Sequence, residues 1–83
     1  MELKDFIKTK IKYNEIVLDF NLPIYTNINK LLPWIVDQFN INSANSNIGI
    51  YNHNWFSFLN MSSNLSDQKI FNNSFLEIFE IDN

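Results

Sequence analysis

Apolar and polar residues alternate along two neighbouring stretches near the start of the chain, residues 6–13 and 16–22. A period of two with one polar face is typical of strands in an antiparallel sheet. Asn14-Glu15 separates the stretches and predicts a hairpin turn, although it is a weaker turn sequence than Asn-Gly. We expect the lysines of the first strand to lie opposite Glu15 and Asp19. The side chains expected to face inward are Ile7, Thr9, Ile11, Tyr13, Ile16, Leu18, Phe20 and Leu22.

The period changes to that of a helix after Pro23, which should end the second strand. Thr26 is a suitable N-cap, because its hydroxyl can accept a hydrogen bond from a free amide of the first turn. Pro33 conflicts with the helix, since it removes one amide donor and crowds the carbonyl of Asn29, at a cost of about 3 kcal/mol. We therefore expect an irregular first turn or a bend. Apolar residues recur with the spacing of one helix face at Ile28, Leu31, Leu32, Ile35, Val36 and Phe39.

Short apolar runs and polar turns fill the second half of the chain. Asn64 or Ser66 can cap a short helical turn that follows the fourth strand. The predicted elements are a loop at 40–47, a strand at 48–51, a turn at 52–54, a short strand at 55–59, a helical turn at 66–69 and a strand at 75–81. The expected inward residues in this half are Ile48, Ile50, Leu65, Ile70, Leu76 and Ile78.

This order of elements predicts an α+β fold in which a mixed sheet of four to five strands packs on one main helix. With 83 residues, we expect a single domain covering residues 1–83. The 46 % hydrophobic content is sufficient for a core, and cysteine is absent, so neither disulfides nor thiolate metal sites can contribute. The fifteen asparagines are scattered, which we interpret as a compositional bias of an AT-rich genome.

Charge and hydropathy narrow the classes of partner. The formal net charge is −3 and arginine is absent, so nucleic-acid binding is not expected. No apolar run approaches the roughly 20 residues that span a bilayer, and the N-terminus lacks a secretion signal pattern. We therefore expect a cytoplasmic protein without direct membrane insertion. A single glycine, Gly49, excludes a glycine-rich phosphate loop.

Two motifs in the chain resemble parts of known proteins. Leu65-Ser66-Asp67-x-x-Ile70, followed by x-Leu76-x-Ile78, resembles the end of ubiquitin and its relatives of the β-grasp fold. The sequence VLDFNLP at residues 17–23, followed by the apolar helix pattern of residues 28–41, resembles the small bacterial EsaB/YukD proteins. That resemblance spans roughly residues 5–81 and implies an accessory or regulatory component of a Gram-positive type VII secretion system.

No residue set in the chain predicts catalysis or a cofactor. The sequence ends without the paired glycines that ubiquitin conjugation or sulfur transfer requires, so neither is expected. His53, the only histidine, should be a solvated turn residue rather than a metal ligand or acid–base group. Asp67 should stabilise the short helical turn, and the serines have no associated base. We therefore expect no enzyme activity, no cofactor and no metal.

Apolar residues on faces that should meet water are the candidate functional residues. Tyr51, Phe75 and Phe79 point opposite to the inward residues of neighbouring strands and could form one exposed aromatic patch. The alternatives are that self-association covers the patch, or that a loop or the N-terminal segment with Leu3 and Phe6 does. Trp34 lies on the shoulder of the helix stripe, where it could either cover the core edge or meet a partner.

These observations lead to two functional hypotheses. The first is a non-enzymatic ubiquitin-like module that binds proteins, such as membrane or ATPase components of type VII secretion, through Tyr51, Phe75, Phe79 and Trp34. The second is a structural β-grasp domain that forms homo-oligomers or docks into a larger complex through its outer sheet face.

Overall fold

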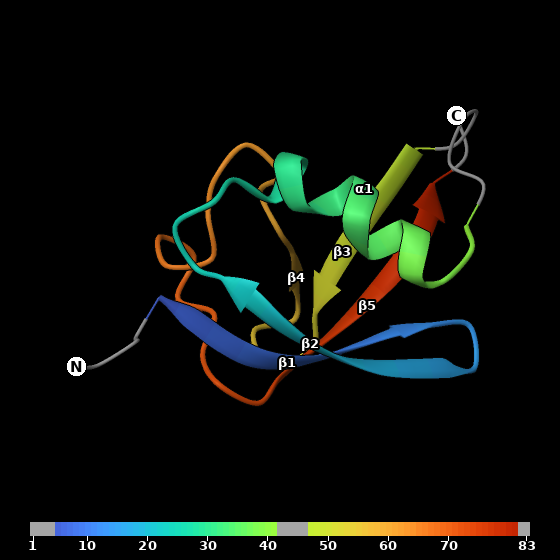
Figure 1. Cartoon of the computed structure of the whole chain (residues 1–83), viewed down its shortest axis with the longest axis horizontal. Coiled ribbons are helices and arrows are strands. Elements are labelled where there is room, and N and C mark those ends of the chain that lie inside the picture. Colours follow the sequence, from blue (N-terminus) through green and yellow to red (C-terminus); the bar gives the residue numbers. More distant parts are fainter. Residues whose placement is uncertain (1–4, 42–46, 82–83) are drawn as a thin grey trace.

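A computed structural model describes residues 5–41 and 47–81, in which one helix packs on one face of a five-stranded sheet (Figure 1). The order across the sheet is β2-β1-β5-β3-β4, with β1 and β5 parallel and the other neighbours antiparallel. The predicted α+β arrangement is confirmed. The elements are β1 (Phe6–Tyr13), β2 (Ile16–Pro23), α1 (Ile28–Gln38), β3 (Asn47–Asn52), β4 (Ser57–Phe58) and β5 (Ser74–Ile81).

The predicted hairpin joins β1 and β2. Asn14 in its turn has a φ of 55°, a left-handed conformation that asparagine tolerates better than most residues. Lys10 and Asp19 are register partners and form an exposed ion pair of 2.8 Å, as expected. Glu15 lies in the turn, outside the paired register, so its predicted position opposite a lysine is wrong. β2 ends at Pro23, as expected, and the proline is itself the last residue of the strand.

The start of α1 differs from the prediction. The N-cap is Asn27 and not Thr26, and its side chain makes no capping hydrogen bond. Instead, the amide of Ile28 donates to the carbonyl of Ser63 at 3.0 Å. A loop far along the sequence therefore satisfies the first-turn amide that a cap residue would otherwise bind.

Pro33 lies inside α1, which is continuous from its first to its last residue. The proline has no amide to donate to the carbonyl of Asn29. The amide of Asn29 donates to the carbonyl of Met61 at 2.9 Å, so the first turn is held to the loop before Pro33 interrupts the helical hydrogen bonds.

The end of α1 is closed by a left-handed residue. Asn40 has a φ of 57°, and its amide donates to the carbonyl of Asp37 at 3.1 Å. The amide of Ile41 donates to the carbonyl of Val36 at 3.1 Å. This pair of bonds is the Schellman motif, which uses carbonyls that the helix leaves free.

The short helical turn after Asn64 is confirmed, as is capping by that residue. The Asn64 Oδ1 accepts the amide of Asp67 at 2.7 Å. The turn ends like α1, because Lys69 has a φ of 59° and the amide of Ile70 donates to the carbonyl of Leu65 at 3.1 Å. Both Leu65 and Ile70 are thereby held in the core.

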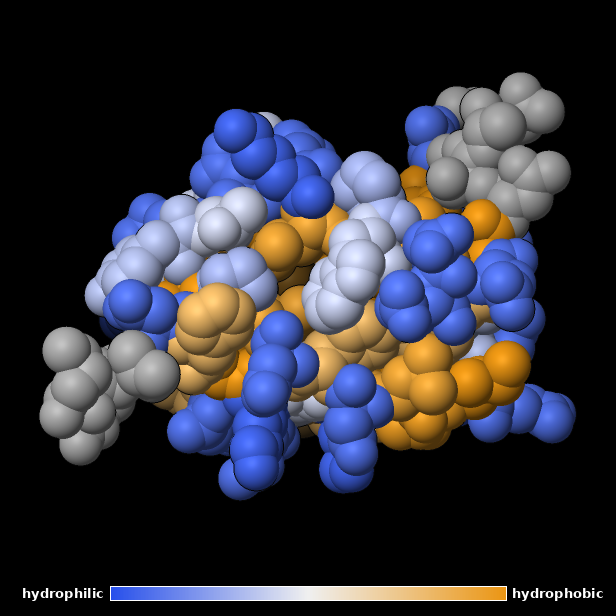
Figure 2. Space-filling model, viewed as in Figure 1, coloured by the Kyte–Doolittle hydropathy of each residue, from blue (hydrophilic) through white to orange (hydrophobic). Residues whose placement is uncertain are grey.

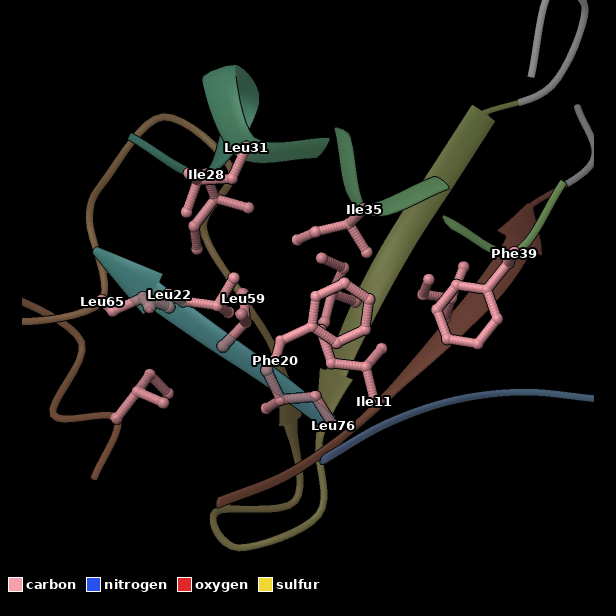
Figure 3. Packing of buried hydrophobic residues seen from close by; sticks show 13 residues of the cluster. Ile11, Phe20, Leu22, Ile28, Leu31, Ile35, Phe39, Leu59, Leu65 and Leu76 are labelled. Atoms are coloured by element: carbon pink, nitrogen blue, oxygen red, sulfur yellow. The ribbon is translucent and has the colours of Figure 1, made fainter. Parts of the chain in front are cut away.

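The core lies between α1, the facing side of the sheet and the loop that carries Leu59 and Leu65 (Figure 3). Most residues predicted to face inward are buried or pack against this core. Ile16 is the exception, since half of its surface is exposed at the tip of the hairpin. The predicted inward position of Ile16 is therefore wrong.

The fourth strand is shorter than predicted. Only Ser57 and Phe58 belong to β4. Trp55 and Phe56 lie in the turn before it, where Phe56 has a φ of 57°. The predicted loop at residues 40–47 falls mainly outside the described residues.

Candidate protein-interaction surface

The side of the sheet opposite α1 carries a group of rings that we call the outer aromatic cluster, made of Tyr51, His53, Phe58, Phe75 and Phe79. Tyr51 is on β3 and alternates with the buried Ile50 and Asn52. Phe75 and Phe79 are on β5 and alternate with the buried Leu76 and Ile78. The structure therefore places these three predicted residues on one face, because successive side chains of a strand point to opposite sides of the sheet.

Neighbouring rings of the outer aromatic cluster pack against one another. Tyr51 lies at the centre, with ring centroids 5.0 Å from His53, 5.2 Å from Phe58 and 6.3 Å from Phe79, all edge to face. Phe58 and Phe79 are 6.0 Å apart, and His53 and Phe75 are 5.0 Å apart. Aromatic pairs at these separations contribute about 0.5–1.5 kcal/mol beyond the area they bury. The cluster is therefore a connected layer rather than isolated rings.

Gly49 makes room for part of this layer. It lies on β3 opposite Phe79, two residues before Tyr51, and so faces the same side. A Cβ at this position would lie 2.9 Å from the Cδ1 atom of Ile81 and 3.2 Å from the ring of Phe58. The missing side chain lets Ile81 and Phe58 close over β3.

His53 lies in the predicted turn, but only 37 % of its side chain is exposed, so it is less solvated than the sequence predicted. Its Nε2 lies 2.8 Å from Oε1 of Glu77, and the Glu77 side chain is largely buried. The imidazole lies between the rings of Tyr51 and Phe75. This places one ionisable pair inside an otherwise apolar surface.

The turn that carries His53 is fixed to β5. The amide of His53 donates to the carbonyl of Phe75 at 3.0 Å, and the Asn54 Oδ1 accepts the amide of Phe75 at 2.9 Å. The buried Asn52 accepts the amide of Asn54 through Oδ1 at 2.8 Å. These bonds fix the turn against β5, and thereby the position of the His53 ring in the cluster.

The outer aromatic cluster is partly accessible to solvent. Phe58 and Phe79 are 53 % and 40 % exposed, whereas Tyr51 is partly buried. Tyr51, His53, Phe58 and Phe79 line a shallow depression of about 260 Å³. Lys10 and Lys12 on β1 are register partners of Phe75 and Glu77, so a basic strand borders the cluster on one side. The surface has the apolar centre and charged border that protein interfaces commonly have.

Trp34, the fourth candidate residue, lies on α1 and is not part of the cluster. Its ring meets the buried Phe20 edge to face at a centroid distance of 5.3 Å, and 46 % of the residue remains exposed. It therefore covers the edge of the core and also presents a free surface. Both roles considered from the sequence are compatible with this position.

The N-terminal segment was one candidate for covering the outer aromatics. Leu3 lies outside the described residues. Phe6 is 55 % exposed and lines a separate depression with Ile24 and Phe71. Phe6 therefore does not cover the cluster.

Phe58, His53 and Ile81 are surface residues that the sequence reasoning did not select. Phe58 could have been found from its position in the predicted fourth strand, which an antiparallel sheet would place beside Tyr51. The contact of His53 with Glu77 depends on the register of β3 with β5, which no local pattern encodes.

The described residues contain no group of three or more histidine, cysteine or acidic side chains placed to hold a metal ion. Within residues 5–41 and 47–81, no helix has the length and apolar character needed to cross a membrane.

No protein-family model and no curated protein sequence matches the chain. Solved structures do match its fold. The ubiquitin-like domain of EccD5 from Mycobacterium xenopi has a TM-score of 0.82 at 9 % identity, covering 94 % of this chain and 97 % of that one. The N-terminal ubiquitin-like domain of the 4931431F19Rik protein has a TM-score of 0.74 at 15 % identity, covering 95 % and 78 %.

A third similar structure is that of ATBAG1 in complex with HSP70, with a TM-score of 0.73 at 14 % identity. The match covers 89 % of this chain and 40 % of that one. At these identities the likeness concerns the fold. The described chain has the ubiquitin-like β-grasp fold.

Proposed function

We propose that this chain is a non-enzymatic ubiquitin-like module that binds a protein partner through the outer aromatic cluster. The observation that carries the proposal is the connected layer of rings that remains accessible on the face opposite α1. Exposed apolar patches on small proteins often mark interaction sites, and aromatic residues are common anchors of interfaces. The ATBAG1 structure gives one case of a protein with a similar fold crystallised in a complex.

We further propose that the partner belongs to a type VII secretion system, with the chain as an accessory or regulatory component of the EsaB/YukD type. This is supported by the sequence resemblance across residues 5–81 and by the likeness in fold to the EccD5 domain. Candidate partners are the membrane or ATPase components of such a system. The proposal also takes residues 1–83 to be one domain located in the cytoplasm.

Binding of each candidate component to the purified chain tests the interaction surface. The variant replaces Tyr51 and Phe79 with serine, and the matched control is Phe56→Ser, which removes a ring that is 78 % exposed and outside the cluster. Loss of an anchor residue costs about 2 kcal/mol or more, so we expect Kd to rise at least about 30-fold for the variant and to stay unchanged for the control. Unchanged binding by a folded Tyr51/Phe79 variant would contradict the proposal.

Two further measurements separate the parts of the proposal. Sedimentation over a range of concentrations should show a monomer, whereas a dimer that the Tyr51/Phe79 variant abolishes would favour the homo-oligomer alternative. Type VII systems of this kind export WXG-type proteins, and their secretion should fall when the variant replaces the natural chain in its host. If binding is lost in vitro and secretion is unaffected, the interaction surface stands and the assignment to type VII secretion is refuted.

A further inference from the structure

A second exposed apolar surface lies at the end of the sheet where β1 begins and β2 ends. Phe6, the first residue of β1, is 55 % exposed, and Phe71, in the loop before β5, is 57 % exposed. Together with Ile24 they line a depression of about 430 Å³, which we call the Phe71 depression. Figure 2 shows apolar atoms exposed beside the start of β1, at the end of the molecule that Figure 1 marks with N.

Hydrogen bonds hold the walls of the Phe71 depression in place. The amide of Asn73 donates to the carbonyl of Lys8 at 2.7 Å, and the Asn72 Oδ1 accepts the amide of Lys8 at 3.0 Å, so the loop before β5 is fixed to β1. The amide of Ser66 donates to the carbonyl of Ile24 at 3.0 Å, which fixes the short helical turn to the residue after β2. The chain by itself therefore forms the depression.

Trp55 extends the apolar surface beyond the Phe71 depression. Its ring centroid lies 6.5 Å from that of Phe71, and its Nε1 donates to the carbonyl of Lys69 at 3.3 Å. Trp55 is 55 % exposed in this position. Three half-exposed rings, those of Phe6, Phe71 and Trp55, are therefore found at this end of the sheet.

The polar part of the lining supplies donors and a cation but no acid. Lys69 carries the positive charge, and no described residue forms an ion pair with it. The Asn72 Oδ1 is bound to a backbone amide, so the NH₂ group of this side chain is the end left for a ligand. Ser66 adds a hydroxyl, and no acidic side chain of the described residues lines the depression. The lining therefore favours an anionic group next to apolar side chains.

We propose that the Phe71 depression binds a short segment of a partner protein in which one or two large apolar side chains are followed by a carboxylate. The apolar side chains contact Phe6 and Phe71, and the carboxylate lies near the Lys69 ammonium and the Asn72 amide. The volume of the depression is in the range of small-ligand sites, so a few side chains fill it.

The area of the exposed rings favours such a segment over a second copy of the chain. A buried aromatic side chain removes about 150–250 Å² from water, so three half-exposed rings offer about 300 Å². A stable dimer buries roughly 800 Å² per partner. A symmetric contact centred on the depression would also bring the two Lys69 side chains together.

The Phe71 depression shares no residue with the outer aromatic cluster. The inference therefore goes beyond the proposed function and does not depend on it.

A blocked six-residue peptide with two leucines followed by two glutamates, between terminal glycines, is a suitable probe. In NMR spectra of the whole chain, we expect shifts of the amides of Phe6, Lys69 and Asn72. The indole N–H signal of Trp55 should shift, because this group bonds to Lys69, and that of Trp34 on α1 should not. A peptide with serines in place of the leucines should not bind, and one with lysines in place of the glutamates should bind at least about threefold more weakly.

Substitutions in the Phe71 depression test the two parts of the site. Phe71→Ser should weaken binding of the leucine–glutamate peptide at least about tenfold, and Phe6→Ser on the other wall should do the same. Lys69→Gln should weaken it about two- to fivefold at low salt and less at high salt. The matched control Phe79→Ser removes a ring that is 40 % exposed in the outer aromatic cluster and should leave the affinity unchanged. Circular dichroism verifies that each variant is folded.

Several outcomes would overturn the proposal. They are the absence of binding at about 1 mM peptide, equal binding of the serine peptide, or shifts confined to the outer aromatic cluster. A concentration-dependent dimer that Phe71→Ser abolishes would overturn it too, because a second copy would then be the occupant. So would peptide binding that appears only after removal of residues 1–4, because the chain's own N-terminus would then fill the depression.

Discussion

Gly49→Ala tests whether the outer aromatic cluster can be altered without loss of the fold. Two effects on the free energy of unfolding oppose each other. Replacing glycine by alanine restricts the unfolded chain and stabilises the protein by about 0.4–1 kcal/mol where the backbone conformation allows it. Gly49 has no positive φ, so alanine is allowed there.

The opposing effect is the contact of the new methyl group with the cluster. Its carbon would lie 2.9 Å from the Cδ1 atom of Ile81 and 3.2 Å from Phe58, so both side chains must move. Both are about half exposed, which leaves them space. The Phe58 ring needs to give by only a few tenths of an ångström, so the main cost is the shift of Ile81 off its rotamer, about 0.5–1.5 kcal/mol. The two effects nearly cancel, and we expect a net change within about 1 kcal/mol.

For a domain of this size, 1 kcal/mol corresponds to about 6 °C in Tm. Thermal and urea unfolding followed by circular dichroism should therefore place Gly49→Ala within about 6 °C of the natural chain, while binding through the cluster weakens. In Ile81→Ala the contacted methyl group is absent, so Gly49→Ala should be more stabilising in that background. A loss of more than about 2 kcal/mol, with no relief by Ile81→Ala, would refute the reasoning, because it would mean that the new Cβ strains the backbone rather than two movable side chains.

Three further predictions concern the fold. Leu65→Ala, at a residue 1 % exposed, should cost about 2–5 kcal/mol in urea unfolding through the cavity it leaves, and a cost below 1 kcal/mol would contradict the burial. Asn40→Ala should destabilise by about 1 kcal/mol and Asn40→Gly should not, because the residue is left-handed; equal effects in thermal unfolding would contradict this. Desolvation and the nearby Glu80 carboxylate raise the pKa of Tyr13 above its ordinary value, so the resulting stability should be kept below pH 10 and fall as the pH rises through the raised pKa. Ultraviolet titration should show a lower Tyr13 pKa in Glu80→Gln, and an unchanged pKa would refute the role of Glu80.

The asparagines show how a compositional signal can hide structural roles. Their abundance suggested only a bias of the genome. In the structure, Asn14, Asn40 and Asn73 adopt positive φ, as glycine often does in other chains. Asparagine side chains also accept backbone amides in turns, as at Asn54 and Asn64. An asparagine substitutes for a cap or a glycine only where the backbone turns, and the turn is not visible in composition.

The sequence by itself determined the elements of this protein and their inner and outer faces. Periods of two and of 3.6 residues are local properties, so they were sufficient to predict the hairpin, α1 and the opposite orientation of Phe79 and Ile78. The same alternation placed Tyr51, Phe75 and Phe79 on one face.

Only the tertiary structure decided which residues distant in sequence contact one another. The amides of Ile28 and Asn29 find acceptors in the loop at 61–63, which replaced the predicted cap and accommodated Pro33. The register of β3 with β5 brings the turn of His53 to Glu77, and the loop before β5 forms the Phe71 depression where it bonds to β1. These features join residues distant in sequence, and a period along the chain carries no information about which distant segments meet.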